Sequence, residues 1–354
     1  MEILGVQILS YSRPIMQRNY AIDFIKFFAI LAVVIIHTFP SNDQLGYFVL
    51  DNLSRFAVPF FFVASGYLFS LKVIDNPQSF AYFKKYVTKI LKIYVSWLIF
   101  YASYDVIRIL LTNGNVKTEL AKYKENLTVL NLFYYGQGTS GYQLWFVISL
   151  VWSIVILYLF YRLKRIRLLL VIAFCLNLLG LFGQSYSVFD ELPVSTTRAA
   201  LYISLFYIVM GFWLASVHTW RKYSARTYFY LFCIFTILQV IEGLWLQKGL
   251  ESKHGEYFFS TIFLTLFLFL YALSKPHLGK NLLITKIGGN SLGIYAIHIF
   301  FIDMVDVLFS KIGLDQSTHN LLQNLVDAFL VFVLSYLSYH FLQKIKISLK
   351  KNRA

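Results

Sequence analysis

Residues 20–39, YAIDFIKFFAILAVVIIHTF, form an apolar stretch that contains an aspartate, a lysine and a histidine. A helix needs roughly 20 mostly apolar residues to cross a bilayer, so this stretch is predicted to span a membrane. A charged side chain at the bilayer centre costs on the order of 2.5 to 3.5 kcal/mol even on lenient insertion scales. We therefore expect Asp23, Lys26 and His37 to face the interior of a helix bundle, where polar partners or a function offset this cost.

The spacing of Lys26 and His37 places both side chains on one face of this helix. They are separated by about 20° around the helix and by roughly 16 Å along it. Ile30 and Val33 lie between them on the same stripe, and Asp23 lies one turn before Lys26. The stripe is charged at one end, apolar in the middle and titratable at the other. We interpret it as one wall of a reaction pathway through the membrane.

The composition favours a polytopic membrane protein. The 354 residues are 58% hydrophobic and 14% charged, whereas soluble domains are about 25% charged. The predicted fold class is all-α, a bundle of about ten transmembrane helices. The expected spans are 21–39, 47–71, 87–112, 143–161, 166–184, 200–217, 227–247, 257–274, 291–310 and 320–343.

The net charge of +15 raises the question of where the basic residues lie. Most of them fall in the N-terminus and in every second loop, and the positive-inside rule then predicts that both termini are cytoplasmic. We divide the chain into a cytoplasmic N-terminus (1–20), a transmembrane domain (21–343) and a basic cytoplasmic tail (344–354). The basicity has a topological explanation, which disfavours nucleic acid as a partner.

This orientation predicts the depth of the polar residues. Asp23 and Lys26 are expected near the cytoplasmic edge and His37 near the outer edge. The second span returns inward, which brings Arg55 level with His37. Pro59 follows four residues later and leaves the carbonyl of Arg55 without its helical partner, so a polar cavity is expected there.

Two segments outside the spans have a pattern of their own. Residues 80–92, FAYFKKYVTKILK, separate aromatic and aliphatic side chains from lysines, as in an interfacial helix that contacts lipid headgroups or donor phosphates. The outer loop at about 113–142 is too long for a simple connector. We expect it to form a partly ordered lid or re-entrant segment over an outer cavity.

The motif formed by Asp23, Lys26 and His37 resembles the first helix of acyltransferase family 3. These proteins are bacterial integral-membrane O-acyltransferases of surface polysaccharides and related acceptors. Three later stretches are similar in the same order: SRFAVPFFFVASGYLF (54–69), LWFVISLVW (144–152) and SLGIYAIHIFF (291–301). Two positions depart from the family pattern, because Lys26 stands where Arg is commoner and Gln143 where a His is common. A lysine binds phosphate as a point charge and not as a bidentate fork.

The resemblance implies an acyl-CoA-dependent O-acyltransferase in the bacterial plasma membrane. Acyl-CoA, expected to be acetyl-CoA, is the donor substrate, and no bound cofactor or metal is expected. The acceptor is a hydroxyl of an extracytoplasmic polysaccharide or lipid-linked sugar. The transmembrane domain 21–343 would then be the acyltransferase domain, with membrane lipids around it.

Each candidate site residue has a functional and a structural interpretation. His37 is the candidate general base for the attacking hydroxyl, or it holds a neighbouring helix or a water. Arg55 is expected to stabilise a developing oxyanion, and Lys26 with Asp23 to bind the donor. The alternatives are structural ion pairs, Lys26 with Asp23 and Arg55 with Asp51.

Other polar residues are expected on the same side of the membrane as His37. Arg198 and Glu242 could orient the histidine or bind the acceptor, and Trp145 could stack on a sugar ring. His298 is expected to pack or to bridge helices. Tyr142 is assigned to helix packing and the interfacial belt.

A second class of function stays open, namely a membrane transporter or a binding module for a sugar or small polar solute. The sequence does not show the paired inverted halves with matched broken segments that many transporters have. A phosphate-binding glycine-rich loop, a zinc-type His/Cys cluster and a Gly-x-Ser-x-Gly elbow are also missing from the sequence. ATP-driven pumps, metalloenzymes and serine hydrolases are therefore disfavoured.

Overall fold

The computed structural model describes residues 18–39, 45–111, 114–190, 192–194, 196–217, 222–311 and 320–351. Within these ranges every regular element is a helix, so the all-α prediction is confirmed. The α-helices are α1 (Tyr20–Thr38), α2 (Leu45–Ser54), α3 (Ala57–Val73), α4 (Ser79–Leu110), α5 (Val116–Asn126), α6 (Trp145–Arg162), α7 (Ile166–Phe182), α8 (Leu205–Ser216), α9 (Ala225–Gly243), α10 (Phe259–Ser274), α11 (Leu283–Gly288), α12 (Ser291–Lys311) and α13 (Leu321–Lys351). Short π- and 3₁₀-turns adjoin them: η1 (Asn131–Tyr135), η2 (Tyr142–Leu144), η3 (Ala200–Ser204) and η5 (Leu244–Gly249).

Seven helical stretches in the described ranges are long and apolar enough to cross a membrane. They are Tyr20–Thr38, Leu45–Val73, Ser79–Leu110, Tyr142–Arg162, Ala225–Gly249, Ser291–Lys311 and Leu321–Ser348. Three shorter apolar helices, Ile166–Phe182, Ala200–Ser216 and Phe259–Ser274, correspond to the remaining predicted spans. All ten predicted segments are therefore helical, as expected of a multi-pass membrane protein. Residues 1–17 and 352–354, parts of the predicted cytoplasmic ends, lie outside the described residues.

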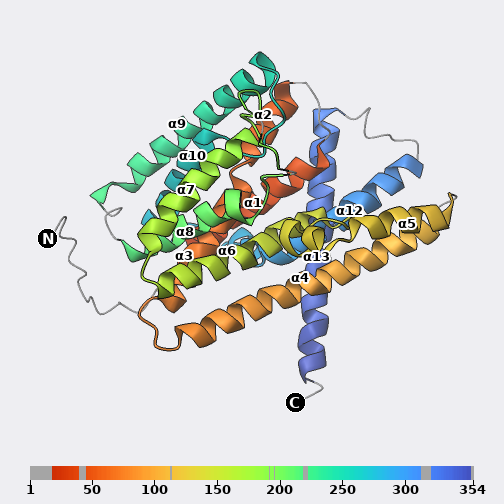
Figure 1. Ribbon diagram of the computed structural model, residues 1–354, viewed down its shortest axis with the longest axis horizontal. Helices are drawn as coiled ribbons and strands as arrows, with labels where there is room; N and C mark the ends of the chain where they lie inside the picture. Colours follow the sequence, from red (N-terminus) through yellow and green to blue (C-terminus); the bar gives the residue numbers. More distant parts are fainter. Residues whose placement is uncertain are drawn as a thin grey trace.

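Helix α1 lies at the centre of the bundle, in contact with α2, α3, α10, α11, α12 and α13. Its start is capped by Asn19, whose side chain accepts from the Ile22 amide and donates to the Ala272 carbonyl of α10. The helix ends at Thr38, because Phe39 is extended and Pro40 follows it in the sequence. Figure 1 shows α4 along one edge of the bundle and α13 crossing it steeply. His37, in the last turn of α1, is thus held where several helices meet.

The second predicted span is broken in the structure. Segment 47–71 was expected to be continuous, but α2 ends at Ser54 and α3 begins at Ala57. Pro59 occupies the first turn of α3, where a missing N–H leaves no helical bond unmade. Arg55 therefore lies at the junction between two helices and not inside one helix.

Two other expectations concern α4 and the loop after it. The interfacial pattern at 80–92 and the third predicted span form one helix, Ser79–Leu110. The long loop contains α5 and η1, so it is partly ordered, as predicted. Trp152 on α6 donates to the carbonyl of Phe133 over 2.7 Å, which ties η1 to the bundle.

Helices α3 and α8 cross at two glycines. A Cβ added at Gly66 would lie 2.0 Å from the carbonyl oxygen of Ile208, and one added at Gly211 would lie 2.1 Å from that of Val63. Small residues allow such close backbone approach between membrane helices. This crossing fixes α3, and hence the Arg55 junction that precedes it, against the rest of the bundle.

Candidate active site

The ring of His37 contacts residues from two distant segments. The hydroxyl of Tyr142, the first residue of η2, lies 3.3 Å from Nδ1 of His37. The ring centroid of His298, on α12, lies 5.4 Å from that of His37. The last turn of α1 is therefore a meeting point of three polar aromatic side chains.

His298 is fully buried, and one of its nitrogens has no partner among the described residues. Its Nδ1 lies 2.7 Å from the carbonyl oxygen of Tyr295, which can only accept, so Nδ1–H donates. In a neutral imidazole Nε2 is then an acceptor, and it is the atom without a partner. The bond to Tyr295 agrees with the predicted packing role, but Nε2 adds an unused acceptor beside His37.

Arg55 is nearly buried at the α2–α3 junction and is held by a carboxylate and an imidazole. Its Nε and one terminal nitrogen donate to Asp51 over 3.0 and 2.5 Å, so the alternative of a structural ion pair with Asp51 is present. The same terminal nitrogen lies 2.5 Å from Nε2 of His254, which belongs to the loop between η5 and α10. Partial burial, and next the charge of Arg55, lower the pKa of His254. This cluster gives Arg55 polar partners, and the polar cavity expected beside it stays a prediction.

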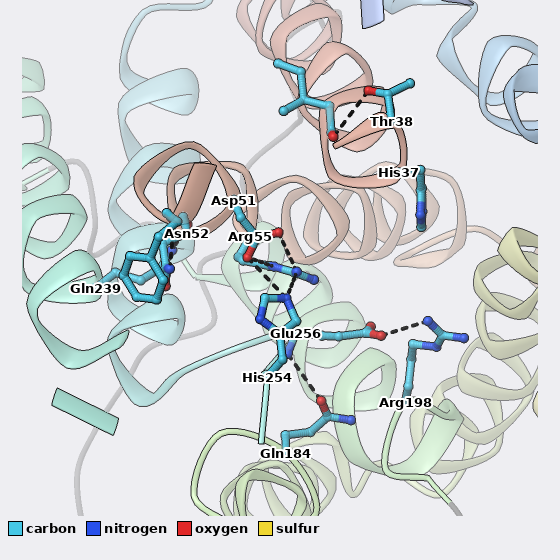
Figure 2. A network of polar contacts seen from close by, with 12 residues as sticks. His37, Thr38, Asp51, Asn52, Arg55, Gln184, Arg198, Gln239, His254 and Glu256 are labelled. Carbon is cyan, nitrogen blue, oxygen red and sulfur yellow. Dashed lines mark hydrogen bonds and ion pairs between the residues drawn. The ribbon is translucent and has the colours of Figure 1, made fainter. Parts of the chain in front are cut away.

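Arg198 and Trp145, both predicted from sequence as acceptor-binding candidates, lie together. The guanidinium of Arg198 is 5.3 Å from the centroid of the Trp145 ring, a cation–π contact. It also donates to Glu256 over 2.7 Å. Figure 2 shows Arg55, His254, Glu256 and Arg198 below His37 in that view. Arg55 and Arg198 thus bring two positive charges to the His37 end of α1.

Glu242, the other acceptor-side candidate, lies at the N-terminus of α10. Its carboxylate accepts from the amides of Phe259 and Ser260 over 2.7 and 2.9 Å, and from the Tyr186 hydroxyl over 2.6 Å. An anion is stabilised at a helix N-terminus by the exposed amides and the helix dipole. Its hydrogen bonds in the described part of the chain do not reach His37, so they do not support the predicted orienting role.

The end of the predicted stripe that carries Asp23 and Lys26 contains an ion-pair group. Asp23 accepts from Arg18 over 2.7 Å and lies 3.7 Å from Nζ of Lys26. The predicted pairing of Lys26 with Asp23 is therefore present, and the Lys26 side chain is 16% exposed. Ile30 and Val33 are 0% and 1% exposed, packed in the core. A ligand that follows the stripe to His37 would require neighbouring helices to move apart.

Gln143, which stands where the family often has a histidine, is fully buried and anchors Tyr142. Its amide nitrogen donates to the Tyr101 hydroxyl over 2.7 Å and to the Ala296 carbonyl over 2.9 Å. Tyr295 donates to its backbone carbonyl over 2.8 Å. Helix α12 therefore positions both His298 and the turn that carries Tyr142.

Sequence reasoning missed the contacts of three residues in this site. Tyr142 was assigned to packing, His298 to bridging, and His254 was not singled out. The position of Tyr142, two residues before the LWF stretch, is the one sequence signal that could have indicated it. In the described ranges no three His, Cys, Asp or Glu side chains are grouped as metal ligands.

Comparisons with known proteins found a family model and two curated relatives that match this chain. A family model described as "Acyltransferase domain", that of acyltransferase family 3, matches residues 19–340. Two curated relatives are amino-acid racemases from Enterococcus faecalis. One is 25% identical over 355 residues, which cover 94% of this chain and 48% of the relative. The other is 26% identical over 230 residues, 60% of this chain and 30% of the relative. The chain spans half or less of the curated relatives it matches, and no solved structure matches it.

Proposed function

This chain belongs to acyltransferase family 3, and from that premise we propose that it is an acyl-CoA-dependent O-acyltransferase. The proposed donor is cytoplasmic acetyl-CoA, and the proposed acceptor is a hydroxyl of an extracytoplasmic polysaccharide or lipid-linked sugar. The proposed setting is the bacterial plasma membrane with both termini cytoplasmic. The observation that carries the proposal is the group of His37, Tyr142 and His298 at one end of a spanning helix, with Arg55 and Arg198 nearby.

His37 has a contact that suits a general base. If Nδ1–H donates to the Tyr142 hydroxyl oxygen, Nε2 carries the free lone pair. As the acceptor oxygen forms a bond to the thioester carbonyl carbon, Nε2 takes its proton. The carbon–sulfur bond then breaks, and the CoA thiolate leaves and takes the proton back from the imidazolium. Nε2 of His298 offers a second acceptor that can orient the same hydroxyl.

Arg55 is suited to stabilise the oxyanion that forms in this step. Asp51 and His254 occupy its Nε and one terminal nitrogen. The other terminal nitrogen makes no hydrogen bond with a described residue, so its N–H groups are available to a developing negative charge. Preorganised donors of this kind stabilise the transition state because they need no reorganisation. Arg198 adds positive charge on the same side.

Lys26 is the proposed contact for the donor. It lies roughly 16 Å along α1 from His37, a separation comparable to an extended pantetheine arm. We propose that the CoA phosphates bind at the Lys26 end and that the thioester reaches the His37 end. Because Ile30 and Val33 are packed, donor binding would have to separate α1 from a neighbouring helix.

The test is transfer by the purified protein in lipid nanodiscs. Labelled acetyl-CoA is incubated with the protein and a glycan extract, and CoA release and labelled glycan are measured. We expect both with the wild type, and rates lower by roughly 10² to 10⁴ with His37→Gln, the matched control. Folded wild-type protein that neither binds acetyl-CoA nor releases CoA would refute the proposal.

A second candidate function is transport or binding of a small polar solute. Similarity to two amino-acid racemases favours this candidate, because those proteins act on amino acids, which are small polar solutes. Proteoliposomes loaded with labelled amino acids separate the two candidates. Uptake or efflux that does not depend on acyl-CoA would support the second one.

A further inference from the structure

A polar cavity of about 680 Å³ lies between the end of α4, helix α5 and the segment 131–140. Clefts of roughly 300 to 1,000 Å³ hold drug-sized ligands, so the volume suits more than a single small ion. The lining includes two asparagines, a glutamine, a threonine, a serine and a glycine: Asn126, Asn131, Gln137, Gly138, Thr139 and Ser140. The residues of the candidate active site do not line this cavity.

One wall of the cavity carries polar groups without partners. The Oγ of Ser140 is buried and has no hydrogen-bond partner among the described residues. Gln137 and Thr139 are half-buried, and their side chains make no hydrogen bond within the described ranges. A buried hydroxyl without a partner costs stability, so it calls for an explanation such as a ligand group.

The three charged side chains of the cavity, Asp105, Arg108 and Glu119, in contrast have partners within the protein. Asp105 accepts from the Ser140 amide over 2.9 Å and from the Tyr123 hydroxyl over 3.1 Å. Arg108 is paired with Asp303 over 2.7 Å, and Glu119 with Lys122 over 3.3 Å. The groups left for a ligand are therefore neutral amides and hydroxyls, which both donate and accept. These groups match a neutral molecule rich in hydroxyls better than an anion or a cation.

The cavity adjoins the His37 site through two connections. Ser140 precedes Tyr142, the residue that contacts His37, by two positions in the chain. Helices α4 and α12 also run side by side, since Tyr101 donates to the Ala296 carbonyl over 2.9 Å and Arg108 binds Asp303. Asp303 follows His298 by five residues, about 7.5 Å along α12. A ligand of several sugar rings in the cavity could therefore extend toward His37.

We propose that this cavity binds the neutral sugar acceptor, with hydroxyls of the sugar bonded by Gln137, Thr139 and Ser140. The inference rests on the proposed acyl transfer, because it assigns the acceptor of that reaction to a place. The sequence predicted a lid over an outer cavity, and the proposal adds the binding groups of that cavity, on α4, α5 and the segment 131–140.

The first experiment measures sugar binding to the full chain in nanodiscs by saturation-transfer NMR. The probes are chitotriose, maltotriose and isomaltotriose, with L-serine and inorganic phosphate as charged comparisons. We expect a neutral trisaccharide to bind, and Gln137→Ala and Ser140→Ala to weaken it about 3- to 10-fold each, the effect of one lost hydrogen bond. Thr139→Val, which keeps the side-chain shape, should weaken it similarly. The matched control is Gln78→Ala, because Gln78 is an exposed glutamine at the opposite end of α4.

A measurement of thermal stability tests whether a variant weakens sugar binding because it is unfolded. Ser140→Ala removes a hydroxyl that has no partner, so the Tm should not fall. Binding of no trisaccharide, unchanged binding by the three cavity variants, or displacement of the sugar by phosphate or L-serine would each overturn the proposal.

The second experiment separates this inference from the proposed function. In the transfer assay, Gln137→Ala and Ser140→Ala should raise the KM for the acceptor and leave kcat and the KM for acetyl-CoA unchanged. Transfer with an unchanged acceptor KM refutes the cavity assignment and leaves acyl transfer standing. Sugar binding that responds to the variants, without any CoA release, refutes acyl transfer and supports the cavity as a sugar site.

Discussion

Replacing His37 by glutamine should abolish most of the transfer activity while leaving the protein folded. The structure limits the expected loss of stability, because His37 is half-buried and makes one side-chain hydrogen bond with the described residues, to Tyr142 over 3.3 Å. Loss of such a bond costs about 1 kcal/mol. A positioned general base contributes roughly 10² to 10⁴ in rate, which corresponds to about 3 to 5 kcal/mol of activation free energy. The effect on rate should therefore far exceed the effect on folding.

The assay is single-turnover transfer from labelled acetyl-CoA, with Tm and acetyl-CoA affinity measured on the same preparations. Tyr142→Phe is the matched control, since it removes the same hydrogen bond and keeps the imidazole. We expect it to lose about 10-fold in rate and a similar amount of stability to His37→Gln. If His37→Gln folds, binds donor and transfers within a few-fold of wild type, His37 is not the base. A large loss of transfer rate in His298→Gln, and not in His37→Gln, would assign the general base to His298.

Four further predictions follow from contacts outside this pair. Lys26→Met should weaken acetyl-CoA binding, and Lys26→Arg should largely retain it. Binding by the wild type should weaken only modestly with added salt, because the site is partly buried. Equal affinity in wild type and Lys26→Met would leave Lys26 a structural role. Glu242→Gln should lower stability by about 1 to 2 kcal/mol, since the carboxylate caps α10, and should leave the rate per folded molecule unchanged; a rate defect without a loss in Tm would contradict this. The pKa of His254 is lowered in the folded protein, so the unfolded chain binds more protons below about pH 6.5. Stability should therefore decrease as the pH falls from there through the folded pKa. The Tm of His254→Gln should vary less between pH 8 and pH 5 than that of the wild type, and an equal dependence of Tm on pH in both would refute the linkage. In a cysteine-free background, an impermeant reagent should label a cysteine placed in 115–125 and spare one in 163–165; the reverse pattern would put His37 on the cytoplasmic side.

The sequence by itself determined the helical architecture of this protein. Hydrophobicity and helix length are local properties, and the bilayer requires long apolar helices, so each of the ten apolar segments could be located without tertiary information. The position of Lys26 and His37 on one face of α1 follows from the 3.6-residue period. The ion-pair partners one helical turn away, Asp23 for Lys26 and Asp51 for Arg55, follow from the same period, and both ion pairs are present in the structure.

Only the tertiary structure decided which distant residues meet. His298 and Tyr142 reach His37, and His254 reaches Arg55, because α12, η2 and the loop before α10 pack around the ends of α1 and α2. Glu242 illustrates the converse. Its predicted place near the outer end of a span is compatible with a role beside His37, but packing of α9 against α10 directs it to a helix N-terminus. Such pairings depend on crossing angles and close approaches between helices, which the hydrophobic pattern of a single segment does not encode.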